Sequence, residues 1–327
     1  MNIVISDDYQ DCIRNLSCFS KLDGHQVSIH RDTLTDEAAI AERFAQADVA
    51  LLVRERTRIT ASLLERLPNL KFISQTGRAA NHVDLAACTA RGIPVAAEGS
   101  ATHAAAELAF GLLLASARNI VVEAERFKSG QWQTTLGVSL RGRTLGIAGY
   151  GKIGSTVAGF GKAFGMKVMV WGERPDSSRR AREDGFEVVA DRREFFSRCD
   201  ALSIHLRLTP SSCGMISASD LDLMKPTAIL VNTSRAEVIA EGALASALQA
   251  GRPGFAAIDV YEREPIHGAD HPLLKLPNAL CTPHIGYVER DTYEAYFNFA
   301  IEQALAWERG EPMNLLNPEV WERRRTA

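Results

Sequence analysis

The sequence has no excess of positive charge. Its 37 lysines and arginines are balanced by 40 aspartates and glutamates, which gives a formal net charge of -3. Proteins that bind nucleic acid or an anionic membrane surface concentrate cations on one face. We therefore expect neither a nucleic-acid partner nor a membrane partner.

The six cysteines lack the CxxC spacing of metal and redox motifs, and several lie in apolar runs where a thiol is normally reduced and buried. The N-terminal residues MNIVISDDYQ lack the basic segment of a signal peptide and predict a strand. The most apolar stretch, 104–122, contains Glu107 and Arg118, so its uncharged run is too short to cross a bilayer. We expect a cytoplasmic protein in which this stretch is a buried helix from about residue 103 to 118.

Short apolar runs alternate with helical patterns along most of the chain. A first series lies at 3–5, 49–53, 72–73 and 93–95, and a second at 144–149, 167–171, 200–204, 228–231, 256–260 and 279–281. This alternation predicts parallel sheets with helices on both faces. Because 327 residues suit two domains of ordinary size, we expect an α/β protein with two doubly wound parallel-sheet domains. Residues 290–308 predict an amphipathic helix, closed by Gly310, that packs on the first domain.

The segment RTLGIAGYGKIGSTVAGFGKAFGMKVMVW, residues 143–171, has the order strand, glycine turn, helix and strand. Gly149, Gly151 and Gly154 have the GxGxxG spacing of a dinucleotide-binding turn. The first glycine permits a tight turn, the second lets backbone N–H groups approach a pyrophosphate, and the third allows the helix to pack closely on the sheet. The alternative is a glycine turn in an α/β sheet that binds no nucleotide.

Three charged residues follow apolar runs of the second series: Arg235 after AILVNTS, Glu264 after AAIDVYER and His284 after ALCTP. Ligands bind outside the carboxyl ends of parallel strands, so these side chains are candidates for chemistry. His284 can exchange a proton with a hydroxyl group, Glu264 can orient the imidazole, and Arg235 can bind a carboxylate. Taken singly, each residue also fits an ordinary role as a turn residue, a strand terminator or a surface charge.

The strings VNTSRAEVI, AAIDVYEREP and TPHIGY, taken with the glycine turn, resemble the D-isomer-specific 2-hydroxyacid dehydrogenases, the family that contains D-3-phosphoglycerate dehydrogenase. The segments LPNLKFISQTGRAANHVDLAACTARGIPV and AAAELAFGLLLASAR extend the resemblance over nearly the whole chain. It implies hydride transfer between NAD(H) and a small 2-hydroxy or 2-keto acid, including 3-phosphoglycerate, with Arg235, Glu264 and His284 as the catalytic set. It also implies a Rossmann domain at 102–286 and a flavodoxin-like substrate domain at 1–101 and 287–327.

The same resemblance places the substrate-carboxylate loop at Gly77, Arg78 and Ala79. Ala79 and Asn81 stand where the family more often has glycine and aspartate, so the geometry of this loop is open. Arg54 is similar in position to a substrate-contacting arginine of phosphoglycerate dehydrogenases. Its alternative role is that of a surface cation beside two further arginines.

The choice of cofactor depends on the end of the second strand, where the family usually has an aspartate and this sequence has Gly172. Glu173 can accept hydrogen bonds from a ribose 2′-hydroxyl, whereas Arg174 can pair with a 2′-phosphate. We expect NAD and keep NADP open. The remaining cofactor contacts implied by the resemblance are Lys152, Ile153, His205, Leu206, Thr209, Thr233, Ser234, Asp259 and Gly286.

Several alternatives remain open at this point. An NADP-dependent glyoxylate or hydroxypyruvate reductase and an NAD(H)-sensing, corepressor-like binding protein share the expected architecture. Formate dehydrogenase shares it too, but it does not need the titratable partner that Glu264 provides for His284. His267 and His271 have the spacing of a helical metal pair, yet Gly268 and Pro272 favour a loop, so we expect no metal. The family resemblance implies a homodimer with helix 103–118 near its interface.

Overall fold

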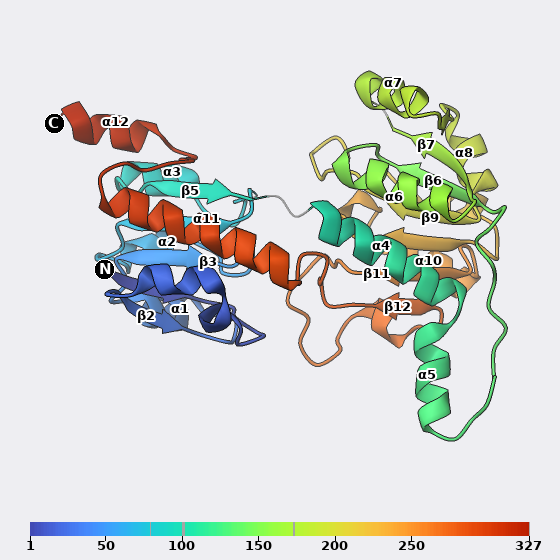
Figure 1. Cartoon of the computed structure of the whole chain (residues 1–327), viewed down its shortest axis with the longest axis horizontal. Coiled ribbons are helices and arrows are strands. Elements are labelled where there is room, and N and C mark those ends of the chain that lie inside the picture. The colour runs from blue at the N-terminus through green and yellow to red at the C-terminus, as the bar shows by residue number, and fades with distance from the viewer. Residues whose placement is uncertain (79, 100–101, 173, 327) are drawn as a thin grey trace. The chain divides into compact units, whose positions relative to one another are not determined.

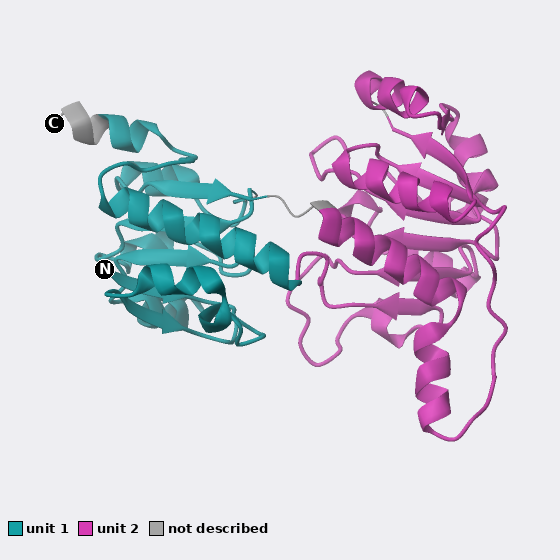
Figure 2. Cartoon of the chain, viewed as in Figure 1, with its two compact units in different colours: residues 1–101, 289–327 teal, residues 102–288 magenta. Residues whose placement is uncertain are grey.

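The computed structural model describes residues 1–78, 80–99, 102–172 and 174–326. The chain forms two compact units (Figure 2). Unit 1 comprises residues 1–101 and 289–327, and unit 2 comprises residues 102–288. Each unit contains one parallel sheet with helices around it, so the expected α/β class with two doubly wound sheets is confirmed (Figure 1).

The sheet of unit 1 has five strands in the order β2-β1-β3-β4-β5, which is the flavodoxin-like order. Its elements are β1 (Asn2–Ile5), η1 (Ile13–Asn15), η2 (Ser17–Leu22), β2 (Gln26–Ile29), α1 (Glu37–Phe44), β3 (Val49–Leu52), α2 (Ala61–Glu65), β4 (Phe72–Thr76), α3 (Leu85–Ala90), β5 (Val95–Glu98), α11 (Arg290–Glu308) and α12 (Glu319–Thr326). The helices begin where the sequence supplies a cap: the side chains of Asp36, Thr60 and Asp84 accept a backbone N–H at the starts of α1, α2 and α3.

Helix α11 returns from the end of unit 2 and packs on β4 and β5 of unit 1 (Figure 1). The buried Ser74 hydroxyl donates to the carbonyl of Ala300 at 3.1 Å and to Gln303 Oε1 at 2.7 Å. Trp307 stacks on Phe72 with ring centroids 5.3 Å apart. These contacts confirm the expectation that residues 290–308 form a helix that packs on the first domain.

The sheet of unit 2 has seven strands in the order β12-β11-β10-β9-β6-β7-β8, which is a Rossmann order extended by one strand. Its elements are α4 (Thr102–Ala117), α5 (Ile120–Lys128), β6 (Thr144–Ala148), α6 (Lys152–Ala163), β7 (Lys167–Trp171), α7 (Pro175–Glu183), β8 (Glu187–Val188), α8 (Arg192–Arg198), β9 (Ala201–Ile204), α9 (Ala218–Leu223), β10 (Ile229–Asn232), η3 (Ala236–Val238), α10 (Ala243–Ala250), β11 (Phe255–Ile258), η4 (Pro272–Lys275) and β12 (Ala279–Cys281).

The core of unit 2 lies on both faces of this sheet because alternate strand residues point to opposite sides. In β7, Val168 and Val170 pack with the helices α4 and α6. Met169 and Trp171 pack on the other face with Phe195 and the helices α8 to α10. A strand that is covered on both faces needs an unbroken apolar run, which is the pattern that the sequence shows.

The apolar stretch 104–122 corrects one expectation. Helix α4 buries one face, which includes Ala106, Phe110 and Leu113, and exposes Glu107 on another. The expected burial therefore holds for one face of the helix. The chain then bends at Asn119, which has a left-handed φ of 52°. The next helix, α5, leaves Ile120 and Val121 exposed. These two residues lie beyond the helix that the sequence predicts at 103–118. Within the described ranges no single helix is long and apolar enough to span a membrane, and α4 and α5 reach that length only as a pair bent by 60°.

The cysteines are free thiols, and Cys18, Cys88 and Cys199 are buried. Burial raises the pKa of each of these three thiols to about 12. They are therefore packing groups in the thiol form, which agrees with the expectation from the apolar runs around them.

Candidate functional site

One row of paired residues runs across six strands of the unit 2 sheet at their carboxyl ends. Read from strand to strand, the row is Trp171, Ala148, Ile204, Asn232, Ile258 and Cys281. The residues that follow directly are Gly172, Gly149, His205, Thr233, Asp259 and Thr282. Five of these six are residues that the sequence singles out. The register therefore brings segments that are far apart in the chain to one edge of the sheet.

The glycine turn joins β6 to α6 at this edge. Gly149 has φ of 95°, and a Cβ there would lie 2.8 Å from the carbonyl oxygen of His205, so only glycine fits. A Cβ on Gly154 would lie 2.1 Å from the carbonyl oxygen of Gly149, because the helix packs directly on the turn. Gly151 precedes the helix, and nothing lies within 4 Å of where its Cβ would be. The turn thus has the tight bend and the close helix packing that the spacing predicts.

Lys152 and Ile153 are the first two residues of α6, and among the described residues no side chain caps this helix at Gly151. The first backbone N–H groups of a helix lack intrahelical acceptors and carry partial positive charge. The start of α6 can therefore bind an anionic group such as a pyrophosphate.

The end of β7 carries the residues that bear on cofactor choice. Gly172 follows the strand directly, and its Cβ position lies 3.9 Å from the Gly149 backbone. Glu173 lies outside the described residues. Arg174 is exposed at the N-cap of α7, next to Pro175 in the first turn of that helix.

The loop after β9 contains His205, Leu206 and Thr209. The backbone N–H of His205 donates to Ala148 O at 2.8 Å, and its Nε2 lies 2.8 Å from the Ser203 hydroxyl. Burial lowers the pKa of His205 to about 4, so the ring is neutral at physiological pH. Leu206 packs against the core, and Thr209 pairs with Ser212 to close the loop. The loop contacts the glycine turn, since the Cβ position of Gly149 lies 2.8 Å from His205 O and 3.1 Å from Leu206 Cδ2.

The turn after β10 is held by the buried side chain of Asn232. Its Oδ1 accepts from the backbone N–H of Ser234 at 3.0 Å and from the Ser234 hydroxyl at 2.9 Å, and its Nδ2 donates to Arg235 O at 2.9 Å. These three bonds hold the turn, with Arg235 three residues beyond the strand. Thr233 Oγ1 is buried and has no partner among the described residues.

His284 and Glu264 form a close pair. Nδ1 of His284 lies 2.5 Å from Glu264 Oε2, and both side chains are about one-sixth exposed, at 16% and 15%. The other carboxylate oxygen of Glu264 accepts from the backbone N–H of Tyr261 at 2.9 Å. Glu264 is therefore fixed from its own strand end, and it orients the imidazole so that Nε2 is the ring nitrogen left for another partner.

Asp259 holds the loop that carries His284. Its Oδ1 accepts from the Thr282 hydroxyl at 2.6 Å and from Ile285 N at 2.8 Å, and its Oδ2 accepts from Gly286 N at 2.9 Å. His284 itself has a left-handed φ of 52°, a conformation that persists only where the surroundings determine it. Burial raises the pKa of Asp259, while these hydrogen bonds and the nearby imidazole act in the opposite direction.

Arg235 belongs to the same edge but to a different strand. It follows β10, whereas His284 follows β12, and one strand lies between them. Two strand spacings amount to about 10 Å. The structure thus pairs His284 with Glu264 and places Arg235 at the same carboxyl-end edge of the sheet.

The residues present fit a dinucleotide. The glycine turn leaves no room for a side chain at Gly149, and the start of α6 can receive a pyrophosphate. At the same edge, the buried Thr233 hydroxyl has no hydrogen-bond partner in the part of the chain that the structure describes. Within the described ranges no group of three histidine, cysteine, aspartate or glutamate side chains is placed to hold a metal ion. His271 instead pairs with Glu262 at 3.1 Å.

The substrate residues expected in unit 1 lie at the carboxyl ends of β3 and β4. Arg54 has φ of 54°, donates its backbone N–H to Thr76 Oγ1 at 2.9 Å and lies 5.6 Å from the centre of the Tyr296 ring. Gly77 has φ of 81°. Arg78 pairs with Glu98 at 2.7 Å, and this bond lowers the pKa of Glu98. Ala79 lies outside the described residues.

Several supporting residues escape a search for charged side chains. Tyr261 and Thr282 fix Glu264 and Asp259, and the ring of Tyr287 lies 5.6 Å from that of His284. Their only signal in the sequence is position, since each lies within a few residues of a predicted strand end or of His284. A backbone donor such as Tyr261 N cannot be predicted from residue type, because every residue except proline has one.

A Rossmann sheet with a glycine turn, together with a paired histidine and glutamate at the same edge, defines a nicotinamide-dependent oxidoreductase. Residues 110–286 match the model of the D-isomer specific 2-hydroxyacid dehydrogenase, NAD binding domain. The chain is 38% identical to a glyoxylate reductase of Thermococcus litoralis, over 86% of this chain and 87% of that one. It is 38% identical to a D-3-phosphoglycerate dehydrogenase of Methanocaldococcus jannaschii, over 85% of this chain and 53% of that one.

Among solved structures, a phosphoglycerate oxidoreductase from Vibrio cholerae O395 superposes with a TM-score of 0.91 at 46% identity, covering 94% of this chain and 99% of that one. The chain belongs to the D-isomer-specific 2-hydroxyacid dehydrogenase family. The expected family, the class of activity on 2-hydroxy and 2-keto acids and the use of NAD(H) are thereby confirmed.

Proposed function

We propose that the chain transfers hydride between NAD(H) and a small D-2-hydroxy or 2-keto acid, with His284 as the acid–base group. The observation that carries this proposal is the 2.5 Å pair between His284 Nδ1 and Glu264 Oε2 at the edge of the sheet that holds the glycine turn. A neutral or weakly polar partner would orient the imidazole without stabilising its protonated form, whereas a carboxylate does both.

In reduction, NADH held by the glycine turn and the strand ends would supply the hydride for the carbonyl carbon. His284 gives the proton on Nε2 to the carbonyl oxygen, which becomes the hydroxyl group, and Glu264 stabilises the imidazolium before that transfer. Arg235 binds the substrate carboxylate and polarises the neighbouring carbonyl through charge-assisted hydrogen bonds. Oxidation runs through the same groups in reverse, with His284 accepting the hydroxyl proton.

For cofactor binding, we assign the pyrophosphate to Gly149, Gly151, Gly154 and the first backbone N–H groups of α6, at Lys152 and Ile153. The nicotinamide end is assigned to the residues beyond β10, β11 and β12. These are Thr233, Ser234, Asp259 and Gly286. The adenosine end is assigned to the residues beyond β7 and β9. These are Gly172, Glu173, Arg174, His205, Leu206 and Thr209.

Substrate selection is assigned to Arg54 and to the loop Gly77, Arg78 and Ala79 of unit 1. The tight turn at Gly77 and the adjacent guanidinium group of Arg54 support binding of an anionic substrate. The relatives suggest two substrate types, glyoxylate and 3-phosphoglycerate. The chain spans 87% of the glyoxylate reductase, about half of the phosphoglycerate dehydrogenase and 99% of the phosphoglycerate oxidoreductase, so both substrate types are tested.

The experiment is a panel of glyoxylate, hydroxypyruvate, pyruvate and 3-phosphoglycerate, each assayed with NAD(H) and NADP(H). We expect turnover with a 2-keto acid and NADH. His284→Ala should abolish this turnover and leave NADH binding, followed by fluorescence, unchanged. Failure of the wild-type protein to turn over any of these acids, with NADH still bound, would favour an NAD(H)-sensing protein instead.

We further propose a cytoplasmic homodimer without nucleic-acid or membrane partners. The free thiols support a reducing compartment. Helix α5 and the segment after it extend away from the sheet of unit 2 (Figure 1) and expose Phe127, Trp132 and Leu136, the last at 95%. Apolar side chains that are gathered on a projecting segment indicate contact with another chain, and a second copy of this chain is the partner that the family resemblance implies.

A further inference from the structure

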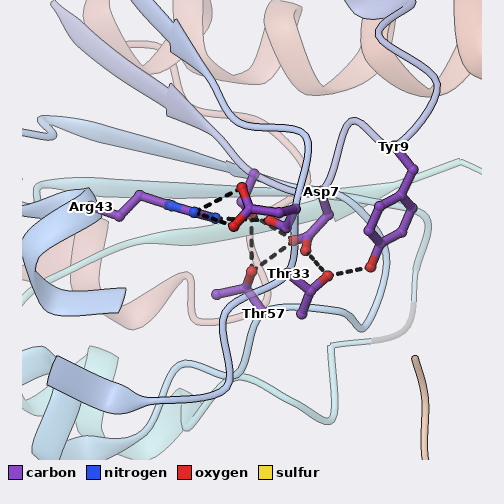
Figure 3. A network of polar contacts seen from close by, with 7 residues as sticks. Asp7, Tyr9, Thr33, Arg43 and Thr57 are labelled. Carbon is purple, nitrogen blue, oxygen red and sulfur yellow. Dashed lines mark hydrogen bonds and ion pairs between the residues drawn. The ribbon is translucent and has the colours of Figure 1, made fainter. Parts of the chain in front are cut away.

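Asp7 is a fully buried carboxylate at the carboxyl end of β1, in unit 1 (Figure 3). Its Oδ2 accepts from the hydroxyls of Ser6 and Thr57, each at 2.7 Å, and its Oδ1 accepts from the Thr33 hydroxyl. The residue also has a left-handed φ of 67°. A buried charge in such a conformation is costly unless the surrounding groups satisfy it, and here hydroxyl donors from three segments do so.

The Thr57 hydroxyl is the point at which this network holds the loop after β3. Residues 54–58 read Arg-Glu-Arg-Thr-Arg, and of these five only Thr57 is buried. Its hydroxyl contacts both Asp7 Oδ2 and the Ser6 hydroxyl, the latter at 2.9 Å. At the beginning of the loop, Arg54 N donates to Thr76 Oγ1. Beyond its end, Ile59 N donates to His82 O at 2.9 Å and Asp84 N donates to Ile59 O at 2.8 Å.

The attachments at Arg54, Thr57 and Ile59 differ in how they depend on the side chain at each position. The bonds at Arg54 and Ile59 involve the backbone and exist for any side chain at those positions. The bond from Thr57 depends on one hydroxyl group in the middle of the loop, between three arginines. Loss of this hydroxyl would remove the attachment of residue 57 to the carboxyl end of β1.

The Thr33 hydroxyl binds the other carboxylate oxygen of Asp7, Oδ1. It donates to Asp7 and contacts the Tyr9 hydroxyl, as the dashed lines of Figure 3 show. Thr33 belongs to the loop after β2, and nearby Arg43 holds Asp32 of that loop through both carboxylate oxygens at 2.8 and 2.9 Å. The Asp7 carboxylate thus binds both the loop after β2, through Thr33, and the loop after β3, through Thr57. Of these two loops, the one after β3 carries Arg54, the arginine assigned to the substrate.

We propose that Asp7 is a positioning residue for substrate binding, which fixes the loop 54–58 through Thr57 and so presents Arg54 in one conformation. The inference rests on the proposed function, because it assigns the anionic substrate to Arg54. A loop that is ordered before the substrate arrives loses less conformational entropy on binding. Asp7 therefore contributes to the affinity for the keto acid without touching it and without taking part in proton or hydride transfer.

The test compares three single substitutions in the full chain, using the keto acid that the wild-type protein reduces with NADH. Thr57→Val keeps the shape of the side chain and removes the hydroxyl donor. Thr57→Ser keeps the donor, and Thr33→Val removes a donor from the same carboxylate on the other loop. We expect Thr57→Val to raise KM for the keto acid about tenfold, as loss of a hydrogen bond to a charged group implies, with kcat and the KM for NADH unchanged. Thr57→Ser should restore KM, and Thr33→Val should leave it near the wild-type value.

The outcomes separate the inference from the function on which it rests. If the wild-type protein reduces no keto acid, the proposed function fails and the inference falls with it. If the wild-type protein is active and Thr57→Val has an unchanged KM, the inference alone is wrong. An equal rise in KM for Thr33→Val would show a general loss of packing and would also overturn it. If Thr57→Val does not fold, Thr57→Ala serves in its place with the same KM criterion, because it also removes the hydroxyl donor to Asp7.

Discussion

The guanidinium group of Arg54 occupies the space that a side chain at residue 77 would need. A Cβ on Gly77 would lie 1.8 Å from Arg54 Nη1, and the Gly77 backbone has a φ of 81° that disfavours other residues as well. The two residues belong to the ends of neighbouring strands, β3 and β4. Residue 77 must therefore be glycine for two reasons: the turn needs a positive φ, and the guanidinium group of Arg54 needs the space.

Gly77→Ala should displace Arg54 and weaken binding of the keto acid. Gly92→Ala is the matched control, because Gly92 has a φ of 69° and nothing lies within 4 Å of its Cβ position. Both substitutions should cost about 1 kcal/mol of unfolding free energy from backbone strain. Only Gly77→Ala should also raise KM for the substrate, measured by steady-state kinetics. Equal KM values in the two variants would show that Arg54 does not act on the substrate.

Glu264→Gln should lower kcat for keto-acid reduction. The amide keeps a hydrogen-bond acceptor for His284 Nδ1, so the imidazole stays oriented, but the neutral amide no longer stabilises the imidazolium. Proton transfer to the carbonyl oxygen should therefore be slower, while binding of NADH is unchanged. Steady-state kinetics in the reductive direction test this, and an unchanged kcat would remove Glu264 from the proposed proton chemistry.

Glu123 should make the segment after α5 sensitive to acid. Hydrogen bonds from Thr134 and Thr135 lower its pKa from 4.5 to about 2. A lowered pKa in the folded state means that the bond contributes fully above the ordinary value and is lost as the pH falls from about 4.5 towards 2. Hydrogen exchange of residues 129–138 should therefore increase over this range. In Glu123→Gln the exchange should already be fast at neutral pH, and slow exchange in that variant would contradict the assignment.

Phe127→Glu and Leu136→Glu should dissociate the proposed homodimer. Both side chains are exposed on the projecting segment of unit 2, and a charge there would have to be desolvated in an interface. Leu274→Glu provides the control, since Leu274 is exposed elsewhere in the unit, in η4. Sedimentation velocity should show a dimer for the wild-type protein and the control, and a monomer for the two variants. A wild-type monomer would refute the proposal directly.

Arg174→Ala should distinguish the two cofactors. Arg174 is exposed at the start of α7, where a 2′-phosphate would meet it, whereas NADH has no group of that charge. We expect the variant to keep the KM for NADH and to lose any residual activity with NADPH. A preference of the wild-type protein for NADPH would reverse the assignment of NAD.

The sequence predicts the buried strands well, because a strand covered on both faces needs a continuous apolar run. The runs around β3, β6, β7, β9, β10 and β11 are of this kind. The strands β2 and β8 are not predicted. Both lie at the edge of a sheet and are partly exposed, so their residues are mixed in polarity and resemble those of a loop.

The candidate site divides in a similar way. Arg235, Glu264 and His284 can be found because each follows an apolar run and because the strand ends of a parallel sheet share one edge. The roles of Asp259 and Asp7 as supports cannot be predicted in this way. Asp259 meets its partners 23 to 27 residues later in the chain, and Asp7 meets Thr57 after 50 residues. The bend at Asn119 also escapes prediction, because the apolar pattern continues across it.

The straight row of residues that crosses six strands of unit 2 has a consequence for how such a protein can diverge. Main-chain bonds between strands fix the row, so it survives most exchanges of side chains within the sheet. The loops that follow the row, one after each strand, can lengthen, shorten or change composition independently of one another. New substrate preferences can therefore arise in one segment while the hydride-transfer geometry that the others provide is inherited intact.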